Sequence, residues 1–475
     1  MIKLEYFHPI KFRPSKLNFL SFRKFQVFQY RHYSSNGNSN NDNDGGNNSS
    51  SLKRYECVEE LMSKEPMVKP KIKASNWRHD DFIKKISAKQ KYSSILNNKD
   101  NVDLSLLKQQ QQLVPKTMSD SCVEKFLPLK SDVELLEDYI SPYGGIRLGK
   151  IFENLDLLAG ASAYKHCEID KSNLAPFLIV TASVDRLDLL IKHLKINDLR
   201  LIGHVTYVGY SSMEVLIKME SLKDGVMQKI ETNPEYIFNE NQDKLEMIMI
   251  ARFTMVAKDP KTGQAARVNP LQLENEKQKR LFQMGKARKI ESAAKSLNKL
   301  PPTEDERLLI HDLYLEYRKY ADTKRKEKKP DDIIWMDETI MESVVLMQPQ
   351  YRNIHGFIFG GYLMKLAYEL AFSNASVFLR NRPVFLALDE ISFRKPVLIG
   401  SVLSLSSQIV YSPGTPHQSF QVAVTADVLD IEKEKRDTTN IFHFTFTSYD
   451  IINVRRVIPN TYGDLMKFLE EQRCF

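Results

Sequence analysis

Two stretches of the chain pair a glycine turn with a helix-length run of apolar residues. Residues 360–380 are apolar on nearly every side apart from Lys365 and Glu369, and a helix of that kind is buried on every side. Residues 144–164 repeat this arrangement, with Asp156 as an acid inside the apolar run. The pattern therefore predicts two long buried helices, each entered through a glycine turn.

Short segments rich in β-branched and aromatic residues surround each helix and predict strands, because turn residues separate them. An antiparallel sheet that wraps one buried helix accounts for both patterns, so the predicted fold class is α+β. The strands are expected at 121–129, 178–188, 199–208, 213–219 and 247–257 in the first half, and near 341–348, 384–393, 398–410, 419–429 and 441–448 in the second.

The second half repeats the order of the first, which indicates an internal duplication. Each unit has one strand, one helix and then four strands. Between the units, residues 259–334 are rich in Lys, Arg and Glu and are interpreted as a charged helical connector. Four short matches carry the repeat: residues 145–149 with 356–360, Val184-Asp185 with Leu388-Asp389, Ile202-Gly203 with Ile399-Gly400, and Arg252-Phe253 with His443-Phe444.

Most of the net charge of +8 comes from one end of the 475-residue chain. Residues 1–33 hold seven basic residues against one acid, Glu5, and the rest of the chain has a net charge of only +2. The charge therefore gives no indication of nucleic-acid binding. The basic segment has interleaved apolar residues and no run long enough for a membrane span. It is interpreted as a transit peptide for the mitochondrial matrix, or else as a basic tail without a targeting role.

The segments that follow offer no visible chemistry. Residues 34–51 consist almost entirely of Ser, Asn, Asp and Gly and form a low-complexity linker. Residues 52–114 are interpreted as an N-terminal extension with one or two helices. The four cysteines show no metal-ligand spacing, which predicts reduced thiols in an intracellular compartment and no metal site.

Several short stretches between residues 115 and 475 together resemble the mitochondrial double-hotdog acyl-CoA thioesterases of the acyl-CoA thioesterase 9 group. A Phe-Gly-Gly turn alone would be a weak signal, whereas the combination is specific. The matching stretches in the first half are Lys116-Thr-Met-Ser-Asp-Ser121, Leu148-Gly-Lys-Ile-Phe-Glu-Asn-Leu-Asp156, Gly203-His-Val205, Ser211-Ser-Met-Glu-Val215 and Val268-Asn-Pro-Leu271. Those in the second half are Arg352-Asn-Ile354, Ile358-Phe-Gly-Gly361, Ala367-Tyr-Glu-Leu-Ala371, Phe393-Arg-Lys-Pro-Val397 and Asn440-Ile-Phe-His-Phe-Thr445.

The resemblance implies two hotdog domains in tandem, at residues 115–258 and 335–475. It also implies hydrolysis of acyl-CoA to a free fatty acid and coenzyme A in mitochondria. Related enzymes use no metal and no cofactor, since coenzyme A is part of the substrate. In these related enzymes a carboxylate from one unit and an amide from the other meet across the unit interface, and water is the final nucleophile, so the resemblance implies the same here. A homo-oligomer through hotdog-domain interfaces is expected.

The first candidate for the carboxylate is Asp156, because a buried acid is costly unless it is paired or functional. The alternative is that Asp156 is a structural polar group whose hydrogen-bonding needs are met within the fold. Asn353 is the amide candidate in an Asn-x-x-Gly context, or else an Asx-turn residue that shapes its loop. Glu369 is either a substitute acid or a partner of Lys365. His355 is a candidate for acid–base work, or a structural loop histidine.

The thioester carbonyl needs a hydrogen-bond donor, and the free N–H groups at a helix start can supply one. Alternatively, the glycines at the helix starts only allow the turn to pack closely against the sheet. Two basic residues after the predicted 384–393 strand could bind coenzyme A phosphates, or form a solvated edge. The binding candidates are Gly149, Lys150, Gly360, Gly361, Arg394 and Lys395.

The second helix has Tyr368 or Ala367 where the first has Asp156, so one active and one degenerate site are predicted for each chain. Two other functions stay open. A hotdog hydratase or dehydratase would use His355 with Glu369 on a hydroxyacyl-CoA. A non-catalytic acyl-CoA sensor would explain the degenerate second helix.

Overall fold

The computed structural model describes residues 113–168, 177–191, 194–232, 245–259, 262–297, 301–321, 328–353, 356–389, 391–430, 435–450 and 453–474. The predicted transit peptide, the linker and almost all of the N-terminal extension lie outside the described residues, as does His355. In the described ranges, no helix is both long and apolar enough to cross a membrane.

The first half is built on helix α6 (Leu148–Cys167), which is buried along most of its length. The helix begins at Leu148 after an extended Arg147, in agreement with the predicted turn and helix. Strands pack against it as an antiparallel sheet: β2 (Val123–Leu127), β3 (Leu178–Val184), β4 (Leu187–Leu189), β5 (Leu199–Val208), β6 (Ser212–Leu222) and β7 (Leu245–Lys258).

The second half has the same order around helix α10 (Gly360–Leu379). The helix ends at Arg380, whose backbone is left-handed. Its strands are β10 (Met341–Leu346), β11 (Pro383–Leu388), β12 (Ile391–Ser392), β13 (Val402–Tyr411), β14 (Ser419–Asp430) and β15 (Lys435–Ser448).

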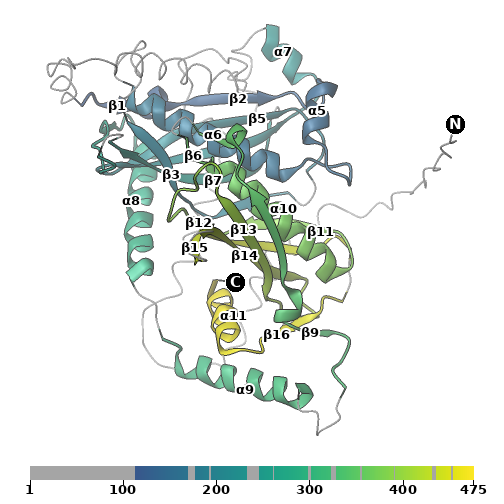
Figure 1. The fold of residues 1–475 in the computed structure, drawn as a ribbon. Helices are drawn as coiled ribbons and strands as arrows, with labels where there is room; N and C mark the ends of the chain where they lie inside the picture. Colours follow the sequence, from purple (N-terminus) through teal and green to yellow (C-terminus); the bar gives the residue numbers. More distant parts are fainter. Residues whose placement is uncertain are drawn as a thin grey trace, which may run out of the picture. The chain divides into compact units, whose positions relative to one another are not determined.

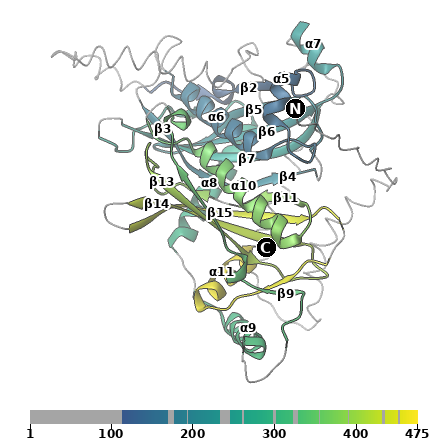
Figure 2. The same cartoon turned by 45° about the vertical axis from the view of Figure 1, so that its right-hand side comes forward.

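The two sets of strands join into one antiparallel sheet of 12 strands among the described residues. Its order is β10-β13-β14-β15-β11-β4-β7-β6-β5-β2, and β3 pairs with both β7 and β12. The junctions are β11 with β4 and β12 with β3. Helices α6 and α10 lie side by side in both views (Figures 1 and 2), and the buried apolar residues of both halves form one continuous cluster.

The junctions explain why two predicted strands are each divided in the structure. The 178–188 strand is β3 followed by β4, and the 384–393 strand is β11 followed by β12. Beyond Asp185 the chain continues to pair with β7, while its partner from the other half changes from β12 to β11. Beyond Asp389 the partner from the first half likewise changes, from β4 to β3. Sequence periodicity carries no information on such a change of partner.

The remaining elements lie outside these two sets. Helix α8 contacts β5, and α8 and α9 both lie between residues 259 and 334. These elements are β1 (Lys116–Thr117), α5 (Val133–Tyr139), α7 (Val226–Thr232), β8 (Leu271–Gln272), α8 (Glu276–Leu297), α9 (Glu304–Ala321), β9 (Ile333–Trp335), β16 (Arg456–Ile458) and α11 (Tyr462–Cys474), with 3-10 helices η2 (Met118–Ser121), η5 (Asp337–Thr339) and η6 (Pro349–Tyr351).

The hydrogen bonds of the two glycine turns fix the register of the repeat. Ser141 N–H donates to Gly145 O at 2.7 Å, and Asn353 N–H donates to Phe357 O at 2.6 Å. Gly144 and Gly356 both have a positive φ, of 75° and 82°. The predicted match of 145–149 with 356–360 is therefore wrong by one residue, and Gly149 corresponds to Gly361.

A second predicted match is also wrong. Gly203 lies in the middle of β5, whereas Gly400 lies in a turn before β13 with a φ of 80°. The shared Ile-Gly sequence does not mark equivalent positions, because Gly203 has a strand backbone and Gly400 has the positive φ of a turn. The matches of Asp185 with Asp389 and of the Arg252 segment with the His443 segment are confirmed, since Asp185 N–H donates to Arg252 O and Asp389 N–H to His443 O, both at 2.9 Å.

Candidate active site

Asp156 lies on α6 and faces the start of α10. The residue is 1% exposed, and one hydrogen bond reaches each of its carboxylate oxygens. Gly361 N–H donates to Oδ2 at 2.6 Å, and the Thr181 hydroxyl donates to Oδ1 at 2.7 Å. The carboxylate thus connects α6, β3 and α10, three elements that are far apart in sequence.

The pKa of Asp156 is raised by burial from an ordinary value of 3.8 to about 6. Desolvation is the largest cause, because a buried carboxylate loses its hydration, and the hydrogen bonds from Thr181 and Gly361 partly oppose the rise. A carboxyl group with this pKa is mostly ionised at pH 7 and can still exchange a proton. Such a group suits general acid–base catalysis.

Gly360 and Gly361 allow α10 to begin directly against α6. A Cβ added at Gly361 would lie 2.9 Å from Glu153 Cα and 3.1 Å from Asp156 Cβ. A Cβ added at Gly360 would lie 3.0 Å from Asp156 Oδ2. The first N–H groups of a helix have no acceptor within it. The missing side chains therefore allow one of these donors to reach a carboxylate on a different helix.

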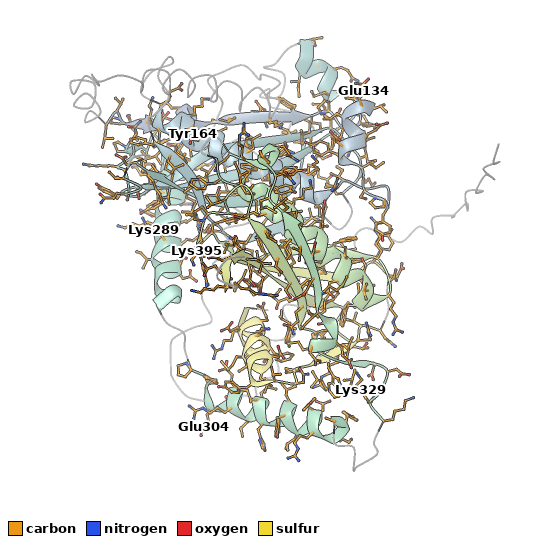
Figure 3. The ribbon with its side chains drawn as sticks, in the orientation of Figure 1. Glu134, Tyr164, Lys289, Glu304, Lys329 and Lys395 are labelled. Atoms are coloured by element: carbon orange, nitrogen blue, oxygen red, sulfur yellow. The ribbon has the colours of Figure 1, made fainter. Side chains whose placement is uncertain are left out.

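The loop after β12 borders the site. Two ring atoms of Phe393 would lie 3.3 and 3.4 Å from a Cβ at Gly360, and Phe393 N–H donates to Ala182 O at 2.8 Å. Arg394 and Lys395 follow and are exposed (Figure 3 labels Lys395). Lys395 forms a salt bridge of 3.2 Å with Asp437. Arg394 and Lys395 thus directly follow Phe393, which contacts the start of α10 beside Asp156. Their contact with the phosphates of coenzyme A stays a prediction.

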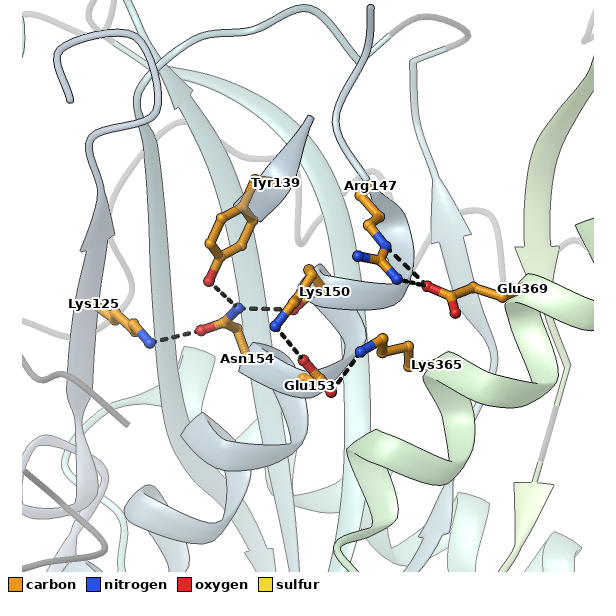
Figure 4. Close-up of polar contacts among 8 residues, drawn as sticks. All are labelled: Lys125, Tyr139, Arg147, Lys150, Glu153, Asn154, Lys365 and Glu369. Atoms are coloured by element: carbon orange, nitrogen blue, oxygen red, sulfur yellow. Dashed lines mark hydrogen bonds and ion pairs between the residues drawn. The ribbon is translucent and has the colours of Figure 1, made fainter. Parts of the chain in front are cut away.

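Ion pairs join α6 and α10 beside the carboxylate (Figure 4). The Glu153 carboxylate lies 3.4 Å from Lys365 Nζ, which comes from α10, and 3.4 Å from Lys150 Nζ, which belongs to the same helix as Glu153. Arg147 Nε donates to Glu369 Oε1 at 2.9 Å. The alternative pairing of Glu369 with Lys365 is therefore wrong. Both charges of α10 therefore have partners in the first half: Glu369 with Arg147, directly before α6, and Lys365 with Glu153 of α6.

Asn353 shapes its own loop. Its Oδ1 accepts the Phe357 N–H at 3.1 Å. The side chain thus shapes the loop, as the structural alternative predicted, but it reaches four residues on and not the two of an Asx-turn. Ser141 does the same in the first half, where its Oγ accepts the Gly145 N–H at 3.2 Å. The two side chains therefore hold equivalent positions, with an amide in one half and a hydroxyl in the other.

The equivalent of Asp156 on α10 is Tyr368, since both residues stand eight positions after the first residue of their helix. The equivalent of Thr181 is Phe385, because a register shift follows each of them in the pairing with the next strand. The Tyr368 and Phe385 rings meet edge to face, with centroids 5.6 Å apart. Aromatic packing thus replaces the carboxylate–hydroxyl contact in the second half.

Thr181 is the one residue of this contact that the sequence interpretation missed. It lies on a strand of β-branched residues, where a threonine is expected for its strand propensity alone. The signal that could have found it is its match with Phe385: a polar residue stands in one copy where the other copy has a large apolar one. That match needs the strand register, which only the structure supplies.

Among the described residues, no group of three or more His, Cys, Asp or Glu side chains is arranged to hold a metal ion.

Comparisons with known proteins identify relatives over most of the chain, although no family model matches it. The mitochondrial acyl-coenzyme A thioesterase 9 of Bos taurus is 37% identical over 410 residues, which is 85% of each chain. The human protein of the same name is 36% identical over the same shares. Acyl-coenzyme A thioesterase 2, chloroplastic, of Humulus lupulus is 35% identical over 76% of this chain and 82% of its own.

Solved structures with a local likeness include an acyl-CoA hydrolase of Staphylococcus aureus. It is 23% identical, covers 30% of this chain and 91% of its own, and has a TM-score of 0.28. The 12:0-ACP thioesterase of Umbellularia californica is 9% identical, covers 69% of this chain and 94% of its own, and has a TM-score of 0.40. On the sequence identity and coverage of its relatives, the chain belongs to the acyl-CoA thioesterase 9 family.

Proposed function

We propose that this acyl-CoA thioesterase hydrolyses its substrate at Asp156, in a site formed where α6 meets the start of α10. Membership of the acyl-CoA thioesterase 9 family carries the activity, which is hydrolysis of a fatty acyl-CoA to a free fatty acid and coenzyme A. The observation that carries the site is the buried Asp156 carboxylate, held by Gly361 N–H and the Thr181 hydroxyl. Burying an ionisable group costs free energy, so packing alone does not explain an acid at this position.

The domain organisation that fits this site is a tandem of two hotdog domains, at residues 115–258 and 335–475, with residues 259–334 as connector. Its support is the repeated order of strand, long helix and further strands in each half. Asp156 comes from the first domain, and Gly361 comes from the second. The catalytic site then requires both domains, and neither alone would be active.

The proposed reaction uses the two groups in turn. The thioester oxygen displaces Asp156 from the Gly361 N–H and accepts that hydrogen bond, while Thr181 keeps hold of the carboxylate. Asp156 then removes a proton from water as the water oxygen attacks the thioester carbon. The developing oxyanion stays at the helix start, where a donor is worth about 10²–10³ in rate. When the carbon–sulfur bond breaks, Asp156 returns the proton to the thiolate of coenzyme A.

The other predicted residues have supporting roles in this proposal. Gly360 keeps the space beside Asp156 free, and Arg394 and Lys395 meet the phosphates of coenzyme A. Glu369 joins α10 to the start of α6 through its ion pair with Arg147, and Lys150 pairs with Glu153 within α6 (Figure 4). Gly149 is the packing counterpart of Gly361. Asn353 holds the loop before α10, and neither it nor Glu369 is the base.

Each chain is proposed to have one catalytic site. The equivalent position in the second half has Tyr368 for Asp156, Phe385 for Thr181 and Gly149 for Gly361. A phenol at Tyr368 cannot act as a base near neutral pH, because burial raises its pKa above its usual value. The mirrored arrangement therefore lacks both the base and the hydroxyl that would orient it.

The proposed setting is the mitochondrial matrix, without a metal or another cofactor. The mitochondrial relatives and the basic residues 1–33 support the mitochondrion. A homo-oligomer through the hotdog domains is part of the proposal.

Thiol release from acyl-CoA substrates tests the activity. Purified protein should release coenzyme A from at least one acyl-CoA between acetyl- and palmitoyl-CoA, as followed with a thiol dye. A hydratase would instead convert the acyl group without releasing thiol. A sensor would bind acyl-CoA and release none. Either result would reject the proposed hydrolysis.

The pH dependence of kcat/KM tests the role of Asp156. The base must be ionised, so kcat/KM should fall as pH drops through about 6, the raised pKa of the free enzyme. The hydrogen bond from Thr181 lowers that pKa. Thr181→Val should therefore move the acidic limb to higher pH. A limb near pH 4, or one that Thr181→Val leaves in place, would mean that Asp156 is not the base.

A further inference from the structure

We infer that the space above Gly160 on α6 receives the acyl chain, and that Gly160 sets how long a chain the site accepts. This inference rests on the proposed hydrolysis at Asp156. Gly160 stands one helical turn after Asp156, in the interior of a largely buried 20-residue helix. Apart from its chain neighbours and the backbone of its own helix, no atom of the described residues lies within 4 Å of a Cβ built there, and Gly160 is half-buried.

A glycine in this position is a cost to the helix, since glycine is about 1 kcal/mol less favourable than alanine in a helix interior. Close approach of a neighbouring element usually explains such a glycine, as it does for Gly361. At Gly160 the described chain shows no such neighbour. The missing side chain therefore leaves room that the described residues do not fill.

Contacts with β3 define where this space lies. Asp156, Gly160 and Tyr164 follow one another at four-residue spacing and share one side of α6. Asp156 is bonded to Thr181, and the Tyr164 hydroxyl accepts the Ile179 N–H at 3.2 Å. Both contacts reach β3. The space above Gly160 is thus bracketed by two contacts between α6 and β3, beside the catalytic carboxylate.

The second half shows what would fill this space. The equivalent of Gly160 is Phe372, because both stand twelve positions after the first residue of their helix. The ring centroid of Phe372 lies 6.0 Å from that of Tyr368 and 6.3 Å from that of Phe446. The copy without a catalytic acid therefore has an aromatic ring where the copy with the acid has none.

The surroundings favour an acyl chain over the polar arm of coenzyme A. Phe446 pairs with Phe385 across the strands, and the equivalent pair in the first half is Thr181 with Met255. Met255 and Ile179 are buried apolar residues, 3% and 5% exposed. The cationic candidates Arg394 and Lys395 are exposed instead. An apolar space next to the carboxylate fits methylene groups, which leave water favourably.

The test is Gly160→Phe, which places in the first half the side chain that the second half holds. The ratio of kcat/KM for the longest acyl-CoA that the wild type hydrolyses to kcat/KM for acetyl-CoA should fall at least about tenfold, because excluded methylenes lose their binding in the transition state. Gly160→Leu should lower the ratio by a smaller factor. Circular dichroism checks that each variant is folded.

Phe372→Ala is the matched control. It empties the equivalent space beside Tyr368, where no hydrolysis is proposed, so the chain-length ratio should stay that of the wild type. An unchanged ratio in Gly160→Phe would overturn the inference. An equal loss for every chain length would also overturn it, because that result would place Gly160 beside the carboxylate or the coenzyme A arm instead of the acyl chain.

A binding series separates this inference from the proposed activity. Calorimetry with S-alkyl-CoA thioethers of increasing length measures the space without turnover. Gly160→Phe should weaken the long thioethers relative to the short ones, whereas equal weakening contradicts the inference. If the wild type releases thiol from no acyl-CoA, the proposed function fails, while the thioether series still decides the role of Gly160.

Discussion

Asp156→Asn should lower kcat by about 10²–10⁴, the range expected for loss of a general base. The amide has nearly the same shape, so its oxygen can accept the Gly361 N–H and its nitrogen can donate to the Thr181 hydroxyl. Substrate binding should therefore change less than turnover. Steady-state kinetics with a thiol dye provide the measurement, on the acyl-CoA that the wild type hydrolyses best.

The same substitution should stabilise the protein at pH 7. Because the folded pKa of Asp156 is raised from 3.8 to about 6, ionisation in the folded state costs about 3 kcal/mol relative to the unfolded state. The wild type thus has the full contribution of this group below pH 4 and loses it as pH rises through about 6. Asp156→Asn cannot ionise, so its stability advantage should appear between pH 4 and 6 and remain above that range.

Tyr368→Phe is the control in the mirrored position, and its turnover should equal that of the wild type. Thermal melts of all three proteins at pH 4 and pH 7 test the stability. Full activity in Asp156→Asn would remove the carboxylate from the mechanism. A melting temperature that falls at pH 7 would show that the carboxylate is a structural group whose hydrogen bonds outweigh its desolvation.

Gly361→Ala should disturb the site far more than Gly149→Ala, although the two glycines hold equivalent positions. At Gly361 the new Cβ would lie 2.9 Å from the backbone Cα of Glu153 and from Phe359 Cε1. Backbone cannot move aside, so the two helices must separate at a cost of about 1–3 kcal/mol. When the helices separate, the 2.6 Å hydrogen bond from the backbone N–H of residue 361 to Asp156 is lost or lengthened. The value of kcat/KM should then fall at least about tenfold.

At Gly149 the nearest atoms are Lys365 Cγ at 2.9 Å and Glu369 Oε1 at 3.3 Å, which belong to side chains and not to the backbone. Gly149 is buried, so Gly149→Ala should lower the free energy of unfolding, but by less than Gly361→Ala, because side chains can shift more easily than backbone. Urea unfolding and kinetics on both variants give the comparison. Equal losses in the two variants would mean that the helix contact, and not the site, governs the effect.

The sequence indicated the repeat and the acid because both are local features. An acid inside an otherwise apolar helix is visible as Asp156 without any structure, and so is the glycine start of α10. The interpretation of Glu369 as a partner of Lys365 failed for the opposite reason. Spacing within one helix shows which residues share a face, and it cannot show that Arg147, directly before the other helix, bonds to Glu369.

The sequence by itself determined the two buried helices, the strands around them, the likeness of the two halves and the carboxylate most worth testing, because burial patterns and turns are written in neighbouring residues. Only the tertiary structure decided what surrounds that carboxylate. Thr181 and Gly361 reach Asp156 from other elements. The strand register shows that Thr181 in the first half is equivalent to Phe385 in the second. Such contacts depend on how helices and strands pack, and periodicity along the chain carries no information about that packing.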